Sequence, residues 1–93
     1  MKPDTRFTVP DHVVPRKLEG ELVLLDLSGG SYFGLDALGT RIWEHVEAGE
    51  PVEAIVADIS GAYDVECETV EQDVRDLLSD LLENGLIAPV EAS

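Results

Sequence analysis

The chain has 93 residues, of which 20 are acidic and 6 are basic, so its formal net charge at pH 7 is −14. This length supports one small domain without room for a deep active-site cavity, so function is expected on an exposed groove or edge. The acidic balance repels phosphate backbones and anionic lipid, so neither nucleic acid nor a membrane is an expected partner, and basic peptides or proteins are favoured.

The amino-terminal residues predict an arm that precedes the folded domain. Residues 1–11 carry two prolines and scattered charge without a sustained hydrophobic period. We therefore expect a flexible arm there, with a short strand around residues 7–9. The folded domain is expected over residues 12–88, followed by a tail over residues 89–93.

An antiparallel meander of three strands is predicted next. The first strand, over residues 12–18, contains Pro15 and belongs at an edge, because proline has no N–H to donate to a ladder. A Glu-Gly turn leads into residues 21–27, which are apolar on both faces and therefore central. A Ser-Gly-Gly turn then allows a tight reversal into a third strand over residues 31–35, at the other edge.

The third strand runs directly into a first helix. Asp36 is its expected N-cap, because the carboxylate can accept from the free amides of the following turn. A buried stripe at helical spacing follows, formed by Leu38, Ile42 and Val46. Pro51 opens a second helix, which ends near residues 60–61.

A third helix carries the longest hydrophobic stripe. Thr69 and Gln72 have the spacing of a capping box at its start, and Asn84-Gly85 is a left-handed stop at its end. The stripe between them is formed by Val70, Val74, Leu77, Leu78, Leu81 and Leu82. Three strands followed by three helices make an α+β domain of winged-helix type, with a three-stranded antiparallel sheet.

Winged-helix domains include both nucleic-acid readers and peptide binders, and charge separates the two. A DNA-reading helix needs basic side chains that reach phosphates and base edges. Residues 66–84 contain seven acidic side chains and one basic one, Arg75. The acidic stripe of Asp73, Asp76, Asp80 and Glu83 favours a basic peptide, although a solvated helix face explains any single one of these residues equally well.

Catalytic and metal-binding sets do not assemble in the sequence. Cys67 stands alone, without local support for a thiol nucleophile paired with His12 or His45. Glu44-His45 lacks a second histidine at helical spacing, and the glycine turn lacks the Lys-Ser/Thr of a phosphate loop. We expect no enzyme activity, no cofactor and no metal. Because a secretory segment, a membrane-spanning run and an internal disulfide are all absent, a cytoplasmic protein is expected.

Three segments together resemble the PqqD-like family, whose members hold the leader peptides of ribosomally made, post-translationally modified peptides. The first is Tyr32-Phe33-x-Leu35-Asp36-x-x-Gly39-x-x-Ile42-Trp43. The second runs through Ile55 and Ile59 to Tyr63. The third is Asp73-Val74-x-x-Leu77-Leu78-x-x-Leu81-x-x-x-Gly85-Leu86-Ile87. The resemblance covers residues 12–88 and implies a binding module.

The resemblance also implies where a leader peptide binds. In such proteins the leader adds as a further strand to the third strand, in a cleft bounded by the third helix. Mapped onto this chain, the implied peptide-binding residues are Ser31, Tyr32, Phe33, Gly34, Val70, Asp73, Val74, Asp76 and Leu77. Strand alternation adds that Phe33 and Leu35 point inward, which leaves Tyr32 as the better candidate for contact.

Within the family, the free-standing length and the Tyr-Phe…Ile-Trp pattern look most like the B1 proteins of lasso-peptide clusters. The chain lacks the Leu-Leu-x-Pro-Glu-Gly hairpin associated with pyrroloquinoline quinone proteins. A B1-like protein implies three partners: a precursor leader peptide, a B2-type cysteine protease that removes the leader, and a cyclase. The alternatives are a peptide chaperone of quinone biosynthesis, an acidic winged-helix regulator, or an acidic adaptor that mimics DNA. The sequence leaves the oligomeric state open.

Overall fold

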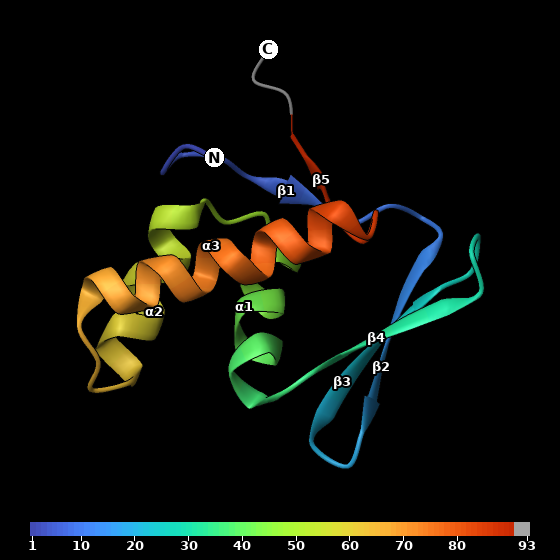
Figure 1. The fold of residues 1–93 in the computed structure, drawn as a ribbon, viewed down its shortest axis with the longest axis horizontal. Coiled ribbons are helices and arrows are strands. Elements are labelled where there is room, and N and C mark those ends of the chain that lie inside the picture. The colour runs from blue at the N-terminus through green and yellow to red at the C-terminus, as the bar shows by residue number, and fades with distance from the viewer. Residues whose placement is uncertain (91–93) are drawn as a thin grey trace.

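Two small sheets and three helices make up the fold (Figure 1). The computed structural model describes residues 1–90, so residues 91–93 of the expected tail lie outside the described residues. The elements follow in the order β1 (Phe7–Thr8), β2 (Val13–Leu18), β3 (Glu21–Asp26), β4 (Ser31–Leu35), α1 (Ala37–Glu47), α2 (Val52–Ala62), α3 (Cys67–Glu83) and β5 (Ala88–Pro89). The predicted α+β domain, with a three-stranded antiparallel sheet followed by three helices, is confirmed.

The larger sheet has the order β2-β3-β4 and is antiparallel throughout, so β3 is central, as its apolar sequence predicts. Cross-strand partners lie on the same face of a sheet. Leu24 and Phe33 are partners on the face that packs toward α1, and Leu25 and Tyr32 are partners on the opposite face. Leu24 is fully buried, whereas Tyr32 is 76% exposed.

The two hairpin turns of this sheet are stabilised by different means. Between β2 and β3, Glu19 and Gly20 have φ angles of 50° and 86°. Two consecutive residues with positive φ form the backbone of a two-residue type I′ turn. Asparagine adopts this left-handed conformation at a lower cost in free energy than glutamate does. Between β3 and β4, one carboxylate oxygen of Asp26 accepts from the Ser28 amide at 3.0 Å and the Gly29 amide at 3.1 Å.

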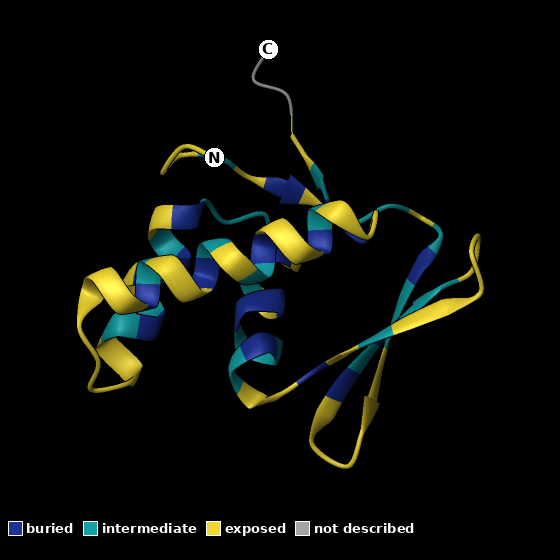
Figure 2. Ribbon diagram, viewed as in Figure 1, coloured by how far each residue is buried: buried dark blue, intermediate teal, exposed yellow. Residues whose placement is uncertain are grey.

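Helix α1 begins as the sequence predicts. The Asp36 carboxylate accepts a 2.8 Å hydrogen bond from the Gly39 amide, which confirms the N-cap. The buried side of α1 includes Ile42, Trp43 and Val46, and Trp43 has no exposed surface. Figure 2 shows the buried residues gathered where the helices and the sheet meet.

The amino-terminal segment takes part in the fold. Phe7 is 2% exposed and belongs to the core, and β1 pairs antiparallel with β5. The first amides of α2 have no side-chain cap; instead, the Val52 amide donates to the Thr5 carbonyl at 3.0 Å and the Glu53 amide donates to the Pro3 carbonyl at 2.8 Å. The division of the chain into arm, domain and tail stays a prediction, but residues 3–8 bond directly to the rest of the molecule.

Helix α3 starts three residues earlier than the capping-box spacing predicts, and that prediction is wrong. Its N-cap is Glu66, without a side-chain cap, so Thr69 already lies within the helix. Gln72 donates to Asp76 one turn further on, at 2.8 Å, whereas a capping box needs its side-chain oxygen to accept from the Thr69 amide. The helix stops at the predicted place, where Gly85 has a φ of 70°.

A charged cluster holds α1 against α2. Arg41 donates twice to the Asp58 carboxylate, at 2.7 and 2.9 Å. One ring nitrogen of His45 lies 2.7 Å from the same carboxylate, and the other bonds to Glu50. Burial by itself lowers the pKa of His45, but the two carboxylates outweigh it and the net pKa is raised. Arg41, and then His45, lower the pKa of Asp58.

Candidate functional site: the free edge of strand β4

The larger sheet has two edge strands, β2 and β4, and only one of them is well suited to accept another strand. β2 carries Pro15 near its centre, followed by Arg16 and Lys17, and both proline and long cationic side chains protect an edge from pairing. β4 has the sequence Ser-Tyr-Phe-Gly-Leu, without proline or charge. A Cβ placed on Gly34 would meet nothing within 4 Å, so a second backbone can approach β4 closely there.

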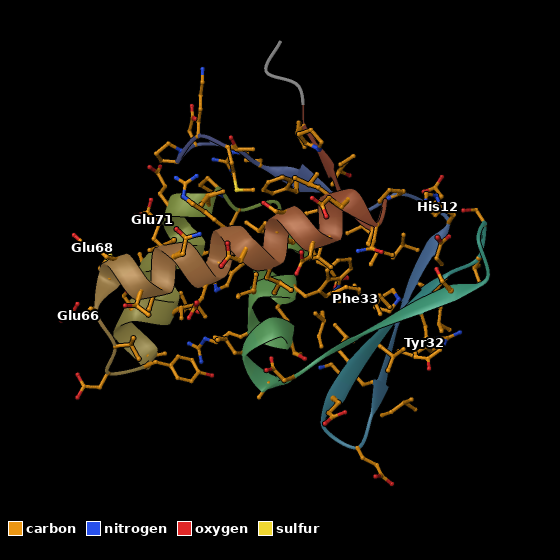
Figure 3. The ribbon with its side chains drawn as sticks, viewed as in Figure 1. His12, Tyr32, Phe33, Glu66, Glu68 and Glu71 are labelled. Carbon is orange, nitrogen blue, oxygen red and sulfur yellow. The ribbon has the colours of Figure 1, made fainter. Side chains whose placement is uncertain are left out.

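The side chains of β4 divide between two environments. Figure 3 places Phe33 on the side of β4 that faces α3 and Tyr32 on the opposite side. Phe33 is half-buried and packs against the core, whereas Ser31, Tyr32 and Gly34 are exposed. A peptide strand added to β4 would therefore place alternate side chains beside Phe33 and beside Tyr32.

The other candidate residues lie on α3. Val70 and Val74 are buried, Leu77 is half-buried, and Asp73 and Asp76 are exposed. Four- and three-residue spacing puts Asp73, Leu77 and Asp80 on one flank of the helix. Asp73, Val70 and Val74 also line a small apolar cavity of about 70 Å³. The rest of its lining is Leu38, Ile59, Tyr63 and Val65.

β4, α1 and α3 each contribute one half-buried apolar side chain to the candidate site. Phe33 from β4, Leu38 from α1 and Leu77 from α3 are all partly exposed, and each packs against the common core. The helical spacing of Leu38 predicts a buried side chain, whereas the structure leaves this side chain partly exposed. Tyr63 and Val65 were missed as well, because they follow α2 and reach the cavity only through the packing of α2 on α3.

The electrostatic character of α3 differs between its two flanks. Arg75, the only base in the helix, donates to Glu71 at 3.1 Å and to the Met1 carbonyl at 2.6 Å, so it is held on the flank toward the amino-terminal arm. The flank with Asp73 and Asp80 has acidic groups and no basic group. It can attract a basic side chain of a bound peptide.

His12 connects the sheet to the end of α3 and was not singled out for this role in the sequence. Its Nε2 donates to the Gly85 carbonyl at 3.2 Å and lies 4.0 Å from the Asp26 carboxylate. Since Gly85 follows α3 and Asp26 ends β3, this side chain helps to fix the position of the helix relative to the sheet. The predicted antiparallel pairing of the first two strands could have indicated that His12 lies near Asp26, because Asp26 pairs with the next residue, Val13.

Within residues 1–90, no group of three or more histidine, cysteine or acidic side chains is arranged to hold a metal ion. A polar hollow of about 550 Å³ lies beside α1, but its charged residues include Arg41, His45 and Asp58, which already pair with one another. No helix in the described part of the chain has both the length and the apolar character needed to cross a bilayer. The edge of β4 and the neighbouring flank of α3 are therefore the best candidate site.

The chain is similar to one protein family and to two solved structures. Residues 21–87 match the family described as coenzyme PQQ synthesis protein D (PqqD). A solved structure of TbiB1 in complex with the TbiA(beta) leader peptide is 43% identical, with a TM-score of 0.83 over 92% of this chain and 99% of that chain. A lasso peptide synthetase B1 complexed with the leader peptide is 25% identical, with a TM-score of 0.84 over 90% of this chain and 99% of that one. No curated protein sequence matches the chain.

Proposed function

Because this chain belongs to the PqqD family, we propose that it is a non-catalytic module that binds the leader peptide of a ribosomally made, modified peptide precursor, and that the precursor is of the lasso type. Both similar structures are B1 proteins named as complexes with leader peptides. The single observation in this chain that carries the proposal is the open edge of β4, which has neither proline nor charge and is bordered by half-buried apolar residues.

The leader adds to β4 as a fourth strand. Backbone hydrogen bonds to the free N–H and C=O groups of β4 supply affinity that does not depend on sequence, at ~0.5–1.5 kcal/mol each. Selectivity comes from side chains that alternate between the two faces. Those directed toward α3 meet Phe33 and Leu77, and a basic residue there meets Asp73 or Asp76.

Binding by itself breaks no bond, so the value of the module lies in delivery. A leader held in an extended conformation keeps the attached core peptide at high effective concentration for an enzyme bound nearby. A B2-type cysteine protease and then a cyclase are the partners proposed for a lasso-type precursor, and the cytoplasm is the compartment proposed for all of them.

A second candidate function is favoured by the family description itself. The PqqD name refers to pyrroloquinoline quinone synthesis, so a peptide chaperone of that pathway uses the same fold. Fluorescence anisotropy separates the two. The protein is titrated into labelled leader peptides of the lasso type and of the quinone type, and saturable binding to the lasso-type leader alone supports the first candidate.

A matched pair of variants tests the site. Leu77 and Leu82 are both half-buried leucines of α3 that pack against the core. They lie roughly 140° apart around the helix, so only Leu77 is on the flank of Asp73. Leu77→Ser is expected to weaken leader binding about tenfold, as loss of part of a leucine's burial predicts, and Leu82→Ser is expected to leave it within twofold.

Both variants lose a similar contact within the fold, so circular dichroism and thermal unfolding should show comparable losses of stability. Equal leader affinities for Leu77→Ser and Leu82→Ser, in folded samples, would remove the β4-facing flank of α3 from the site. A folded protein that binds neither leader, nor the leader of its own pathway, would contradict leader recognition altogether.

A further inference from the structure

The two walls of the candidate site belong to different halves of the fold. The larger sheet packs on α1 through β3 and β4, whereas α3 packs along α2. Phe33 on β4 and Leu77 on α3 are both only half-buried, so the two walls do not close fully on one another. Contacts made outside the site therefore have to set the distance between β4 and α3.

In the described part of the chain, a single hydrogen bond joins the segment that carries the larger sheet to α3 and its last turn. His12 donates from Nε2 to the Gly85 carbonyl, over 3.2 Å. Both ends of this bond are held in place. The His12 carbonyl accepts from the Leu27 amide at 2.8 Å, which continues the pairing of β2 with β3. Gly85 is followed directly by Leu86, which is 2% exposed and belongs to the core.

The His12 side chain also lies beside the turn that leads into β4. Its Nε2 is 4.0 Å from the Asp26 carboxylate. That carboxylate holds the turn through the Ser28 and Gly29 amides, and Asp26 pairs with Ser31, the first residue of β4. Figure 3 shows His12 between the end of α3 and this turn. The imidazole therefore links the start of β4 to the end of α3, at one end of the space between the two walls.

The link is well suited to set a geometry without deciding whether the chain folds. The His12 side chain is 39% exposed and is not part of the hydrophobic core. Because water competes for such a bond, its loss shifts an equilibrium only about two- to tenfold. A shift of that size leaves a domain folded, but it is large enough to change the affinity for a ligand that needs both walls in place.

We propose that His12 is a positioning residue for leader binding, whose bond to Gly85 holds α3 at the distance from β4 that a leader requires. This inference rests on the proposed leader binding, and it adds a residue that does not itself contact the peptide. Without the bond, α3 and the sheet can separate, and the fraction of protein that is ready to bind falls. The apparent affinity for a leader falls in proportion to that fraction.

Two substitutions of His12 separate the hydrogen bond from the bulk of the side chain. In His12→Gln the amide nitrogen stands about where Nε2 stood and can still donate, whereas His12→Leu keeps similar bulk without a donor. His12→Leu is expected to weaken leader binding about fivefold in anisotropy titrations, and His12→Gln to stay within twofold of the unchanged protein. Circular dichroism should show that both variants are folded.

A double-mutant cycle reports whether His12 acts through α3. Leu77→Ser removes an α3 contact to the leader, so part of the advantage of a fixed α3 is lost with it. Combined with His12→Leu it should weaken binding about fifteenfold, short of the product of the single losses, about fiftyfold. Tyr32→Ser is the matched control, because Tyr32 lies on β4 itself and faces away from α3. Its loss and that of His12→Leu should multiply.

A distance measurement examines the positioning without any leader. Cys67→Ser removes the only cysteine of the chain, and Leu27→Cys and Glu83→Cys then place spin labels at exposed positions beside the β3–β4 turn and at the end of α3. The distribution of distances between the labels should be broader with His12→Leu than with His12→Gln or with His12 unchanged.

Equal leader affinities for His12→Leu and the unchanged protein would overturn the inference. Equal weakening by His12→Leu and His12→Gln would also overturn it, because the donated hydrogen bond would then not matter. So would losses that simply multiply with Leu77→Ser, or a label distribution that does not change. Failure of the unchanged protein to bind any leader would instead defeat the proposed function, and the inference with it, whatever the label distances are.

Discussion

Replacing Phe7 by alanine tests whether the amino-terminal segment belongs to the folded domain. Phe7 is 2% exposed, and β1, which contains it, contacts both α1 and β5. Truncating a buried phenylalanine to alanine costs ~3–5 kcal/mol, since it loses apolar burial and leaves a cavity. A domain of this length has a free energy of unfolding of roughly 5–14 kcal/mol, so the loss would be about a fifth of the stability or more.

Trp43 provides the assay, because it is the only tryptophan and is fully buried. Its fluorescence should report urea unfolding as a single transition. With a denaturant dependence of about 1–3 kcal/mol per molar urea, Phe7→Ala is expected to lower the unfolding midpoint by about 1 M or more. The control is Thr8→Ala, an exposed position in the same short strand, which should change the midpoint by a few tenths of a molar at most.

A loss below about 1 kcal/mol in Phe7→Ala, comparable with that in Thr8→Ala, would refute the reasoning. Residues 1–11 would then be a separable arm, as their composition predicts, and the core would be complete without Phe7. A large loss would move the amino-terminal boundary of the domain from residue 12 to the start of β1 or before it.

Three further predictions concern charge and backbone conformation. Asp76→Lys should weaken binding of a basic leader and flatten its dependence on salt without unfolding the protein, and an unchanged salt slope in anisotropy titrations would remove Asp76 from the site. The pKa of His45 is raised above its ordinary 6.5 and that of Asp58 is lowered below 3.8, so their cluster stabilises the fold between these values. The His45 contribution should disappear as pH rises through its raised pKa, and the Asp58 contribution as pH falls below 3.8. In His45→Gln, the free energy of unfolding should no longer fall as pH rises through the range in which His45 loses its proton. Glu19→Asn should stabilise the protein by about 0.5–1 kcal/mol in the same urea assay, since asparagine adopts a positive φ more readily than glutamate, and a loss of stability would contradict the type I′ assignment.

Local signals in the sequence were sufficient where one or two residues decide the structure. Asp36 caps the first turn of α1, Gly85 terminates α3, and an apolar strand on both faces became the centre of the sheet. The start of α3 was misjudged because Thr69 and Gln72 match a capping pattern by spacing alone, while the hydrogen bond of Gln72 goes to Asp76. A spacing rule cannot tell whether the Gln72 side chain will accept from a backbone amide before it or donate to a carboxylate after it.

The candidate site was predictable only where its residues lie on one strand or helix. Strand alternation correctly separates Tyr32 from Phe33, because both lie on one element whose period is fixed. Leu38, Tyr63 and His12 reach the region from other elements, and their positions depend on how α1, α2 and the sheet pack together. Phe7 lies more than 80 residues from its partner Pro89, and a two-residue strand carries no periodic signal of its own.

The pairing of β1 with β5 brings the two ends of the described chain to one side of the molecule (Figure 1). In that view the pair lies away from the β3–β4 hairpin. A tether attached before β1 or after β5 would leave from this side and keep the edge of β4 unobstructed. The domain could thus be inserted into a surface loop of a larger enzyme, or fused at either end, with its peptide-binding edge still open.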